Sequence, residues 1–131
     1  MKLQSIVQGC DEMDLIRIGR ISAIDYKNGM ASVVYADRDN MVTPFFPMLA
    51  NEYSMPKVRD LVAVLHLPRS NQGVILGRIW NGTNKPPEGK KGIYRKDFDR
   101  NGTAFVKYNE KTGELIIQAK KITKKEASDS E

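Results

Sequence analysis

From Leu15 onward the chain consists of short apolar runs, most of which alternate apolar and polar residues at every second position. A period of two is typical of β-strands with one buried face, and a short continuous apolar run is consistent with a strand buried on both faces. Five such runs, rich in β-branched and aromatic residues, occupy the ranges 15–26, 30–36, 41–49, 61–67 and 74–80. The pattern therefore predicts an all-β chain.

Turn residues separate these runs. Asn28-Gly29 joins the first two as a hairpin, because both residues tolerate positive φ. The third run contains Pro44 and Pro47, and proline lacks the donor that a central strand needs. We therefore expect an edge strand or an extended segment here, with Phe45 and Phe46 covering the core.

The first run is long and changes its pattern midway. Ile16 and Ile18 share one parity, whereas Ile21 and Ala23 share the other, which predicts a bulge or bend at Gly19-Arg20. Five strands, the first long and bent, predict a small closed barrel similar to the oligonucleotide/oligosaccharide-binding (OB) fold over residues 15–81. We expect its core to contain Ile21, Leu61, Ala63, Leu65, Val74 and Leu76.

The remaining segments differ in composition. Residues 1–14 have no clear period and are expected to form an arm, with a short helix as one alternative; residues 82–92 are a linker by composition, and 120–131 a charged tail. Between linker and tail, the runs 93–98, 103–108 and 114–119 are separated by turns at Asn101-Gly102 and Thr112-Gly113.

Three short strands cannot enclose a core alone. Identical copies in a homo-oligomer are the simplest source of apolar partners, so residues 93–119 are predicted to form a short β-stalk that trimerises. The candidates for its interior are Val106, Tyr108, Leu115 and Ile117. Phe105 and Ile116 fall on the opposite faces of their strands, which leaves open which face is interior.

Charge and composition restrict the function classes. The net charge of +5 divides into +1 for residues 1–84 and +4 for 85–131, a small excess that favours a solvated surface over a nucleic-acid footprint. The single Cys10 excludes an intrachain disulfide and favours a reducing compartment. With no signal peptide and no apolar run of ~18 residues, we expect a protein that is cytoplasmic and soluble when synthesised.

No residue pattern predicts an enzyme, a cofactor or a metal site. His66 is the only histidine, and metal sites need three or four ligands, so we interpret it as structural. Cys10 could act as a nucleophile only beside a base, and the sole histidine is not suited to that role. Asp37 and Asp39 fit a charged turn between strands. Trp80 is interpreted as a packing anchor.

An alternative is an OB-fold module that binds single-stranded nucleic acid or oligosaccharide, with Phe45 and Phe46 as stacking platforms. The low charge of residues 1–84 and the flanking prolines argue against it, so no specific nucleic acid is expected.

Five segments of the chain have a recognisable order and spacing. They are Ile18–Asp25, the Pro-Phe-Phe-Pro-Met motif 44–48, Val58–Leu65, the Gly-to-Trp-Asn motif 73–81, and 108–117. Together these segments resemble the phage baseplate assembly and tail-spike family, which includes the needle proteins of type VI secretion and of contractile bacteriocins. The resemblance spans residues 16–119.

The resemblance implies a homotrimer with three barrels ringed above a stalk of interwoven strands, assembled into a phage tail or tail-like particle. Its partners would be baseplate hub and tail tube proteins and the target cell envelope. The stalk is short, there is no room for the lysozyme domain of some relatives, and the lone His66 does not support their His-x-His metal tip. Either a separate spike-tip protein completes the point or the chain is a short-spike variant.

Overall fold

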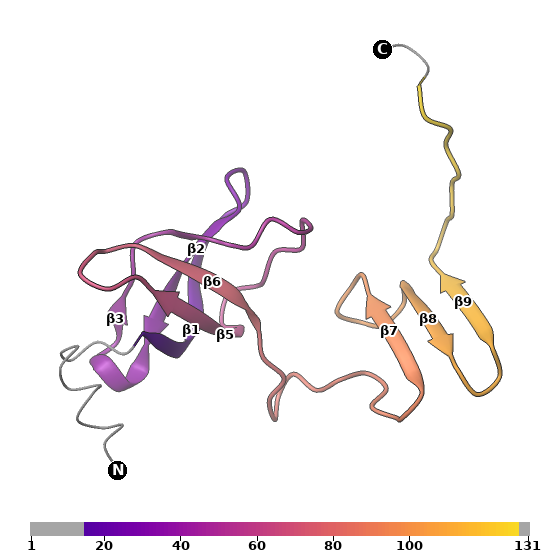
Figure 1. Cartoon of the computed structure of the whole chain (residues 1–131), viewed down its shortest axis with the longest axis horizontal. Helices are drawn as coiled ribbons and strands as arrows, with labels where there is room; N and C mark the ends of the chain where they lie inside the picture. Colours follow the sequence, from indigo (N-terminus) through magenta and orange to yellow (C-terminus); the bar gives the residue numbers. More distant parts are fainter. Residues whose placement is uncertain (1–14, 129–131) are drawn as a thin grey trace. The chain divides into compact units, whose positions relative to one another are not determined.

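The computed structural model describes residues 15–128 and shows an all-β protein. It divides into two compact units, with the boundary between Asn84 and Lys85, and each unit contains one antiparallel sheet (Figure 1). The predicted arm 1–14 lies outside the described residues.

The first unit contains the five predicted strands, the third of them split in two. Its strands are β1 (Ile16–Asp25), β2 (Met30–Tyr35), β3 (Met41–Val42), β4 (Phe46–Pro47), β5 (Leu61–His66) and β6 (Gly73–Arg78), and a 3-10 turn at Ala36–Arg38 follows β2. The sheet order is β3-β2-β1-β5-β6, and β4 pairs with β2. Pro44 lies in the interruption between β3 and β4, where a residue without an N–H donor breaks the ladder.

Continuous strand pairing does not close this sheet into a barrel. Its two ends nevertheless approach each other, because an isolated parallel bridge joins Met48, directly after β4, to Ile75 in β6. The sheet is therefore strongly curved, with one seam that is held at a single point.

β1 alternates without interruption through its first half. Arg17, Gly19 and Ile21 point inward, and Ile16 and Ile18 point outward. The predicted bulge at Gly19-Arg20 is wrong: the register shifts between Ile21 and Ala23 instead. Gly19 has a different reason to be glycine, since a Cβ there would lie 2.6 Å from the side chains of Tyr35 and Val33.

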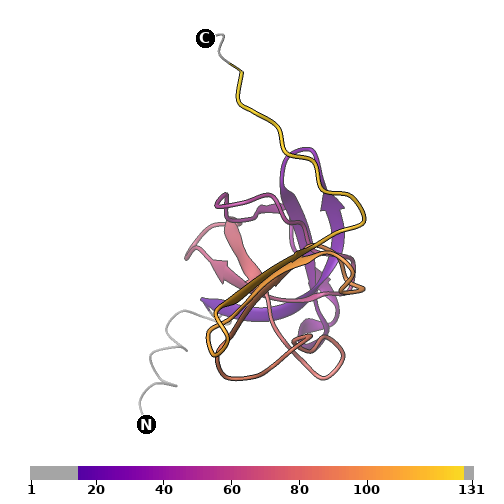
Figure 2. The same ribbon diagram turned by 90° about the vertical axis from the view of Figure 1, so that its right-hand side faces the viewer.

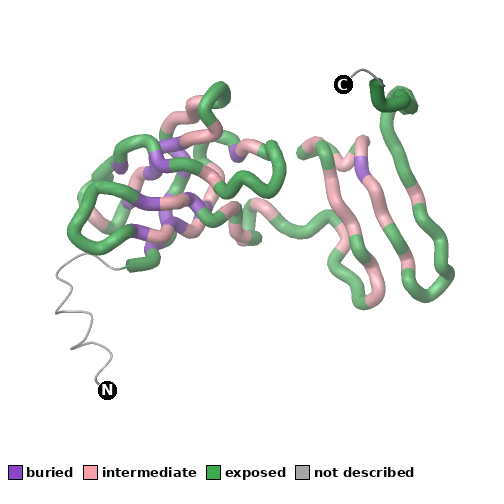
Figure 3. Tube along the Cα trace, turned by 45° about the horizontal axis from the view of Figure 1, so that its top comes forward, coloured by how far each residue is buried: buried purple, intermediate pink, exposed green. Residues whose placement is uncertain are grey.

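The core of the first unit lies on the concave side of the sheet, where the buried positions gather (Figure 3). Its members are Ile21, Ala31, Val33, Tyr35, Phe46, Val62, Val64 and Ile75. Of the core residues expected from sequence, Ile21 is confirmed. Leu61, Ala63, Leu65 and Val74 are only half-buried and Leu76 is exposed, because the other parity of β5 and β6 faces inward.

Two aromatic expectations also need correction. Phe46 is buried as expected, but its neighbour Phe45 is exposed. Trp80 is 55% exposed, so it is not a packing anchor of this unit.

The second unit is a single-layer sheet of three strands, seen nearly edge-on in Figure 2. Its strands are β7 (Ile93–Asp97), β8 (Phe105–Asn109) and β9 (Glu114–Gln118), in the order β7-β8-β9. The turns contain Gly102 and Gly113 with φ of 72° and 73°, a conformation that glycine adopts without strain. Residues 119–128 continue beyond β9 without further strand pairing (Figure 1).

Candidate interaction surface

The register of the second sheet sorts its side chains onto two faces. Directly paired residues share a face, so Tyr94, Tyr108 and Leu115 form one row, and Lys96, Val106 and Ile117 form the next. We call these six residues the open face. All four residues that the sequence proposed for the interior of a stalk lie on it.

The open face is apolar and accessible. Leu115 is 59% exposed and Ile117 58%, and Tyr94 and Tyr108 are also exposed. Lys96 is its one charged member. Exposed apolar surface that is contiguous across strands marks an interaction site, whereas scattered apolar residues do not.

The opposite face is covered by the chain itself. We call it the clamped face, and its central residues are Arg95, Asp97, Phe105, Lys107 and Ile116. The guanidinium carbon of Arg95 lies 3.8 Å from the ring centroid of Phe105, which is buried. This contact explains why Phe105 breaks the pattern of the other apolar residues: it packs beneath a cation of its own sheet.

Glu88 joins the clamped face to the segment that precedes β7. Its carboxylate accepts hydrogen bonds from Lys107 Nζ at 2.8 Å and from Arg95 Nη1 at 3.3 Å. Arg95 also donates to both carboxylate oxygens of Asp97 at 3.0 Å. Residues 85–92, assigned to a linker by composition, thus hold one member of this ion-pair network.

The charges of this network stabilise one another. The hydrogen bond from Lys107 lowers the pKa of Glu88, and Arg95 lowers it further. The hydrogen bond to Asp97 raises the pKa of Arg95. The clamped face is thus stabilised by ion pairs within one chain, whereas the open face remains apolar and exposed.

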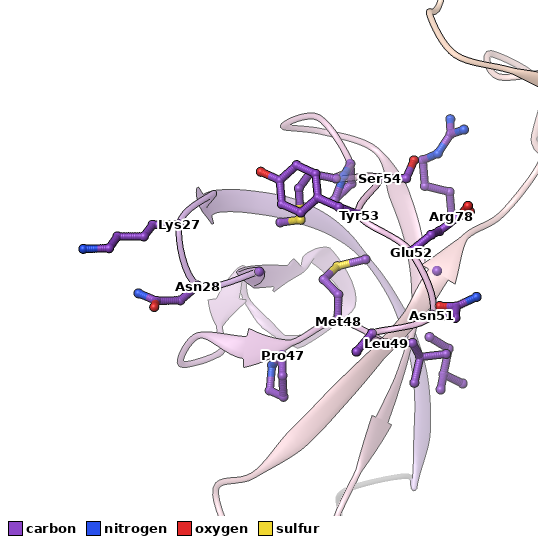
Figure 4. Close-up of a pocket in the computed structure, with 16 residues that line it drawn as sticks. Lys27, Asn28, Pro47, Met48, Leu49, Asn51, Glu52, Tyr53, Ser54 and Arg78 are labelled. Atoms are coloured by element: carbon purple, nitrogen blue, oxygen red, sulfur yellow. The ribbon is translucent and has the colours of Figure 1, made fainter. Parts of the chain in front are cut away.

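A groove in the first unit is a second candidate surface (Figure 4). It has a volume of about 810 Å³ and lies between the β1–β2 hairpin, the segment 47–56 and the end of β6. Met48, Leu49 and Tyr53 line it together with the polar side chains of Asn51 and Glu52. Mixed polar and apolar linings of this kind can bind a small ligand or an extended peptide.

The buried polar residues of the first unit form a structural cluster. The Tyr35 hydroxyl lies 2.6 Å from His66 Nε2, and the Phe46 ring meets His66 edge-on. Arg17 stacks over the Tyr35 ring and donates to Asp37 at 2.8 Å. His66 is thus embedded in the core, and Asp37 is bonded to a strand residue at the 3-10 turn.

Neither a metal site nor a helical membrane span is found in residues 15–128. No group of three or more His, Cys, Asp or Glu side chains in that part of the chain could hold a metal ion. None of its helical segments has the length and apolarity needed to cross a membrane.

Comparison with known proteins adds no relative: no family model and no curated protein matches the sequence.

The sequence pattern grouped four residues of the open face correctly, but it did not predict the ion-pair network of the clamped face. Alternation within β8 and β9 was sufficient to group Val106 with Tyr108 and Leu115 with Ile117. Glu88 gave no such signal, because it lies in an irregular segment rich in Pro, Gly and Lys. Arg95 and Asp97 carry opposite charges two positions apart, and this spacing was the available sign that one face of β7 is ionic.

Proposed function

We propose that this protein is a non-enzymatic structural subunit: a trimeric baseplate hub and spike protein of a contractile phage tail or a phage-tail-like particle. In it, residues 15–81 act as an OB-fold-like barrel and residues 93–119 as a short β-stalk. The observation that carries the proposal is the open face, which is apolar and exposed although the chain covers the other face of the same sheet.

Trimerisation about a threefold axis would give the open face the apolar contacts that one chain does not provide. Three copies that turn their open faces toward one axis bury Val106, Leu115 and Ile117 against one another. The outer strands β7 and β9 are the edges of this sheet, and a neighbouring copy can pair with each of them. Burying an aliphatic side chain such as Leu or Ile contributes roughly 1.5–3 kcal/mol.

The topology of the first sheet supports the barrel. β1 pairs with both β2 and β5, and β5 pairs with β6. The bridge between Met48 and Ile75 lies where a five-stranded Greek-key barrel would close. Such barrels are often only partly closed along one seam, so a sheet whose ends meet at a single bridge is compatible with this proposal.

The resemblance of the five sequence segments supports the choice of particle. In that setting the barrels dock on baseplate hub and tail tube proteins, and the stalk points toward the target envelope. A separate spike-tip protein completes the point if the stalk is too short to pierce alone.

The substitution Val106→Asp tests the proposal. Three carboxylates near one axis are costly to desolvate, so the trimer should dissociate into monomers. We expect light scattering to show a fall in molar mass from about three times 14.8 kDa to that of one chain. Residues 93–118 should then become protease-sensitive while the first unit survives.

Asn109→Asp is the matched control. It introduces the same charge on the same strand but on the clamped face, and it keeps the oxygen that accepts from Lys111 N. We expect this variant to remain trimeric. A trimeric, protease-resistant Val106→Asp protein, or a wild-type chain that is monomeric at micromolar concentration, would contradict the proposal.

The groove of Figure 4 favours one other function, an OB-fold module that binds single-stranded nucleic acid or oligosaccharide. Such a module predicts a monomer and a ligand-dependent shift of the resonances of Tyr53 and Met48 in NMR titrations. An electrophoretic shift of oligonucleotides at low salt that disappears at high salt would assign the ligand as nucleic acid.

A further inference from the structure

The chain leaves the second sheet as a basic segment. Residues 119–128 follow β9 without a helix or a further strand (Figure 1), and every one of them is exposed (Figure 3). The segment contains four lysines in two adjacent pairs, 120–121 and 124–125, and one acid, Glu126. The next acids in the sequence, Asp129 and Glu131, also follow the last lysine. We call residues 119–125, which contain all four lysines and no acid, the basic tail.

The lysines of the basic tail differ from the cations of the clamped face. Arg95 and Lys107 are paired with Glu88 within the same unit. By contrast, none of the four tail lysines forms an ion pair within residues 15–128. Their positive charges are therefore accessible to an anionic partner, and the local field of the tail attracts one.

Ile122 adds an apolar group to the basic tail. It lies between the two lysine pairs and is 64% exposed. An aliphatic side chain flanked by lysines matches the interface of an anionic lipid bilayer, where the ammonium groups reach the headgroups and the apolar side chain enters the acyl boundary. Residues 119–128 contain neither arginine nor an aromatic residue, the side chains that stack on the bases of single-stranded nucleic acids. The composition of the tail therefore fits a lipid surface better than a nucleic acid.

We propose that the basic tail binds reversibly to the surface of membranes that contain anionic phospholipids, with its lysines at the headgroups and Ile122 in the interface. One lysine near such a surface contributes roughly fivefold to the partition coefficient. A single tail therefore binds weakly, and several tails in one assembly bind more tightly because each raises the effective concentration of the others. The inference does not rest on the proposed spike, since a monomer presents the same tail.

Co-sedimentation of the full chain with unilamellar vesicles tests the proposal. We expect binding at low salt to vesicles of three parts phosphatidylcholine to one part phosphatidylglycerol, and at least tenfold weaker binding to pure phosphatidylcholine. Added salt should release the protein, because it screens exposed charges. Lys124→Ser/Lys125→Ser should bind the anionic vesicles at least tenfold more weakly than the wild type. Ile122→Ser should weaken binding several-fold although it leaves the charge unchanged.

Lys90→Ser/Lys91→Ser is the matched control, since it removes an adjacent, exposed lysine pair from the segment before β7. It should retain most of the vesicle binding, and a loss equal to that of Lys124→Ser/Lys125→Ser would refute a site in the tail. A wild-type chain that does not bind anionic vesicles would also refute the proposal. If that chain instead shifts a single-stranded oligonucleotide and Lys124→Ser/Lys125→Ser does not, the tail binds nucleic acid.

Light scattering on the same samples separates membrane binding from assembly. The tail variants should keep the molar mass of the wild type, because the proposal assigns these side chains to a lipid surface and not to a contact between copies. A fall in molar mass that accompanies the loss of vesicle binding would overturn the proposal and assign the tail lysines to assembly.

Discussion

At the scale of single residues, the first unit depends on side chains that fit against Tyr35. Its ring lies against Gly19, its hydroxyl contacts His66, and Arg17 stacks over its face. Tyr35 is fully buried, and burial raises its pKa to about 12. Substitution or protonation of the residues around Tyr35 should therefore change the stability of the first unit.

Gly19→Ala should destabilise the first unit. The added methyl group would lie 2.6 Å from Tyr35 Cδ1 and from Val33 Cγ1, and overpacking of this kind costs ~1–3 kcal/mol. Urea unfolding followed by circular dichroism measures the loss. Gly82→Ala is the control, because nothing lies within 4 Å of its added methyl group; equal stability of the two variants would contradict the packing argument.

His66 predicts a loss of stability in mild acid. Burial lowers the pKa of His66 below 6.5, and the positive charge of Arg17 lowers it further. The unfolded chain therefore takes up a proton as the pH falls below about 6.5 before the folded chain does, so the free energy of unfolding declines from there down to the folded pKa.

Unfolding in urea at pH 7.5 and pH 5.5 measures this effect, and His66→Gln should reduce the difference. The Tyr35 hydroxyl contacts the ring, the positive charge of Arg17 acts on it, and Arg17 is itself paired with Asp37. A pH dependence that is equal in both proteins would assign the effect to other groups.

At the scale of elements, the sequence predicted strand positions well and strand faces poorly. Turn residues such as Asn28-Gly29 fix where strands end, and every predicted strand of residues 15–119 has a counterpart. In β5, however, both parities are apolar, so periodicity could not decide between Val64 and Leu65. Only pairing across the sheet, which brings Val64 beside Ile75 in the core, settles the question.

A pair of truncations checks the observed faces. Ile75→Ala removes a fully buried side chain and should cost ~2–5 kcal/mol. Leu65→Ala removes a half-buried side chain that points away from the core and should cost clearly less. Urea unfolding measures both losses. A larger loss for Leu65→Ala than for Ile75→Ala would show that the opposite faces of β5 and β6 point toward the core.

The clamped face makes a separate prediction for Glu88→Gln. The variant loses the charge that holds Lys107 and Arg95 together, so residues 85–92 should detach from the sheet more often. Trypsin should then cleave faster at Lys90 and Lys91, as measured by mass spectrometry. Glu126→Gln, in the exposed tail, is the control; equal cleavage rates in both variants would mean that Glu88 does not anchor this segment.

At the scale of the whole molecule, the chain combines two units that differ in whether they enclose a hydrophobic core. The first unit has a core of its own, whereas the described residues 85–128 of the second unit form a single layer of three strands. The sequence foresaw this contrast, because three short strands have too little apolar surface to enclose a core. It could not foresee the ion-pair network, which depends on the fold of an irregular segment.

The ion-pair network gives the two faces of the second sheet opposite responses to ionic strength. Added salt screens the partly exposed pairs of Glu88 with Lys107 and Arg95. Strongly hydrated anions such as sulfate favour the burial of apolar side chains such as Leu115 and Ile117. In ammonium sulfate, association through the open face should therefore become tighter, whereas the ion pairs that hold residues 85–92 to the sheet should become weaker. A single solute would thus distinguish assembly through the open face from the contacts within one chain.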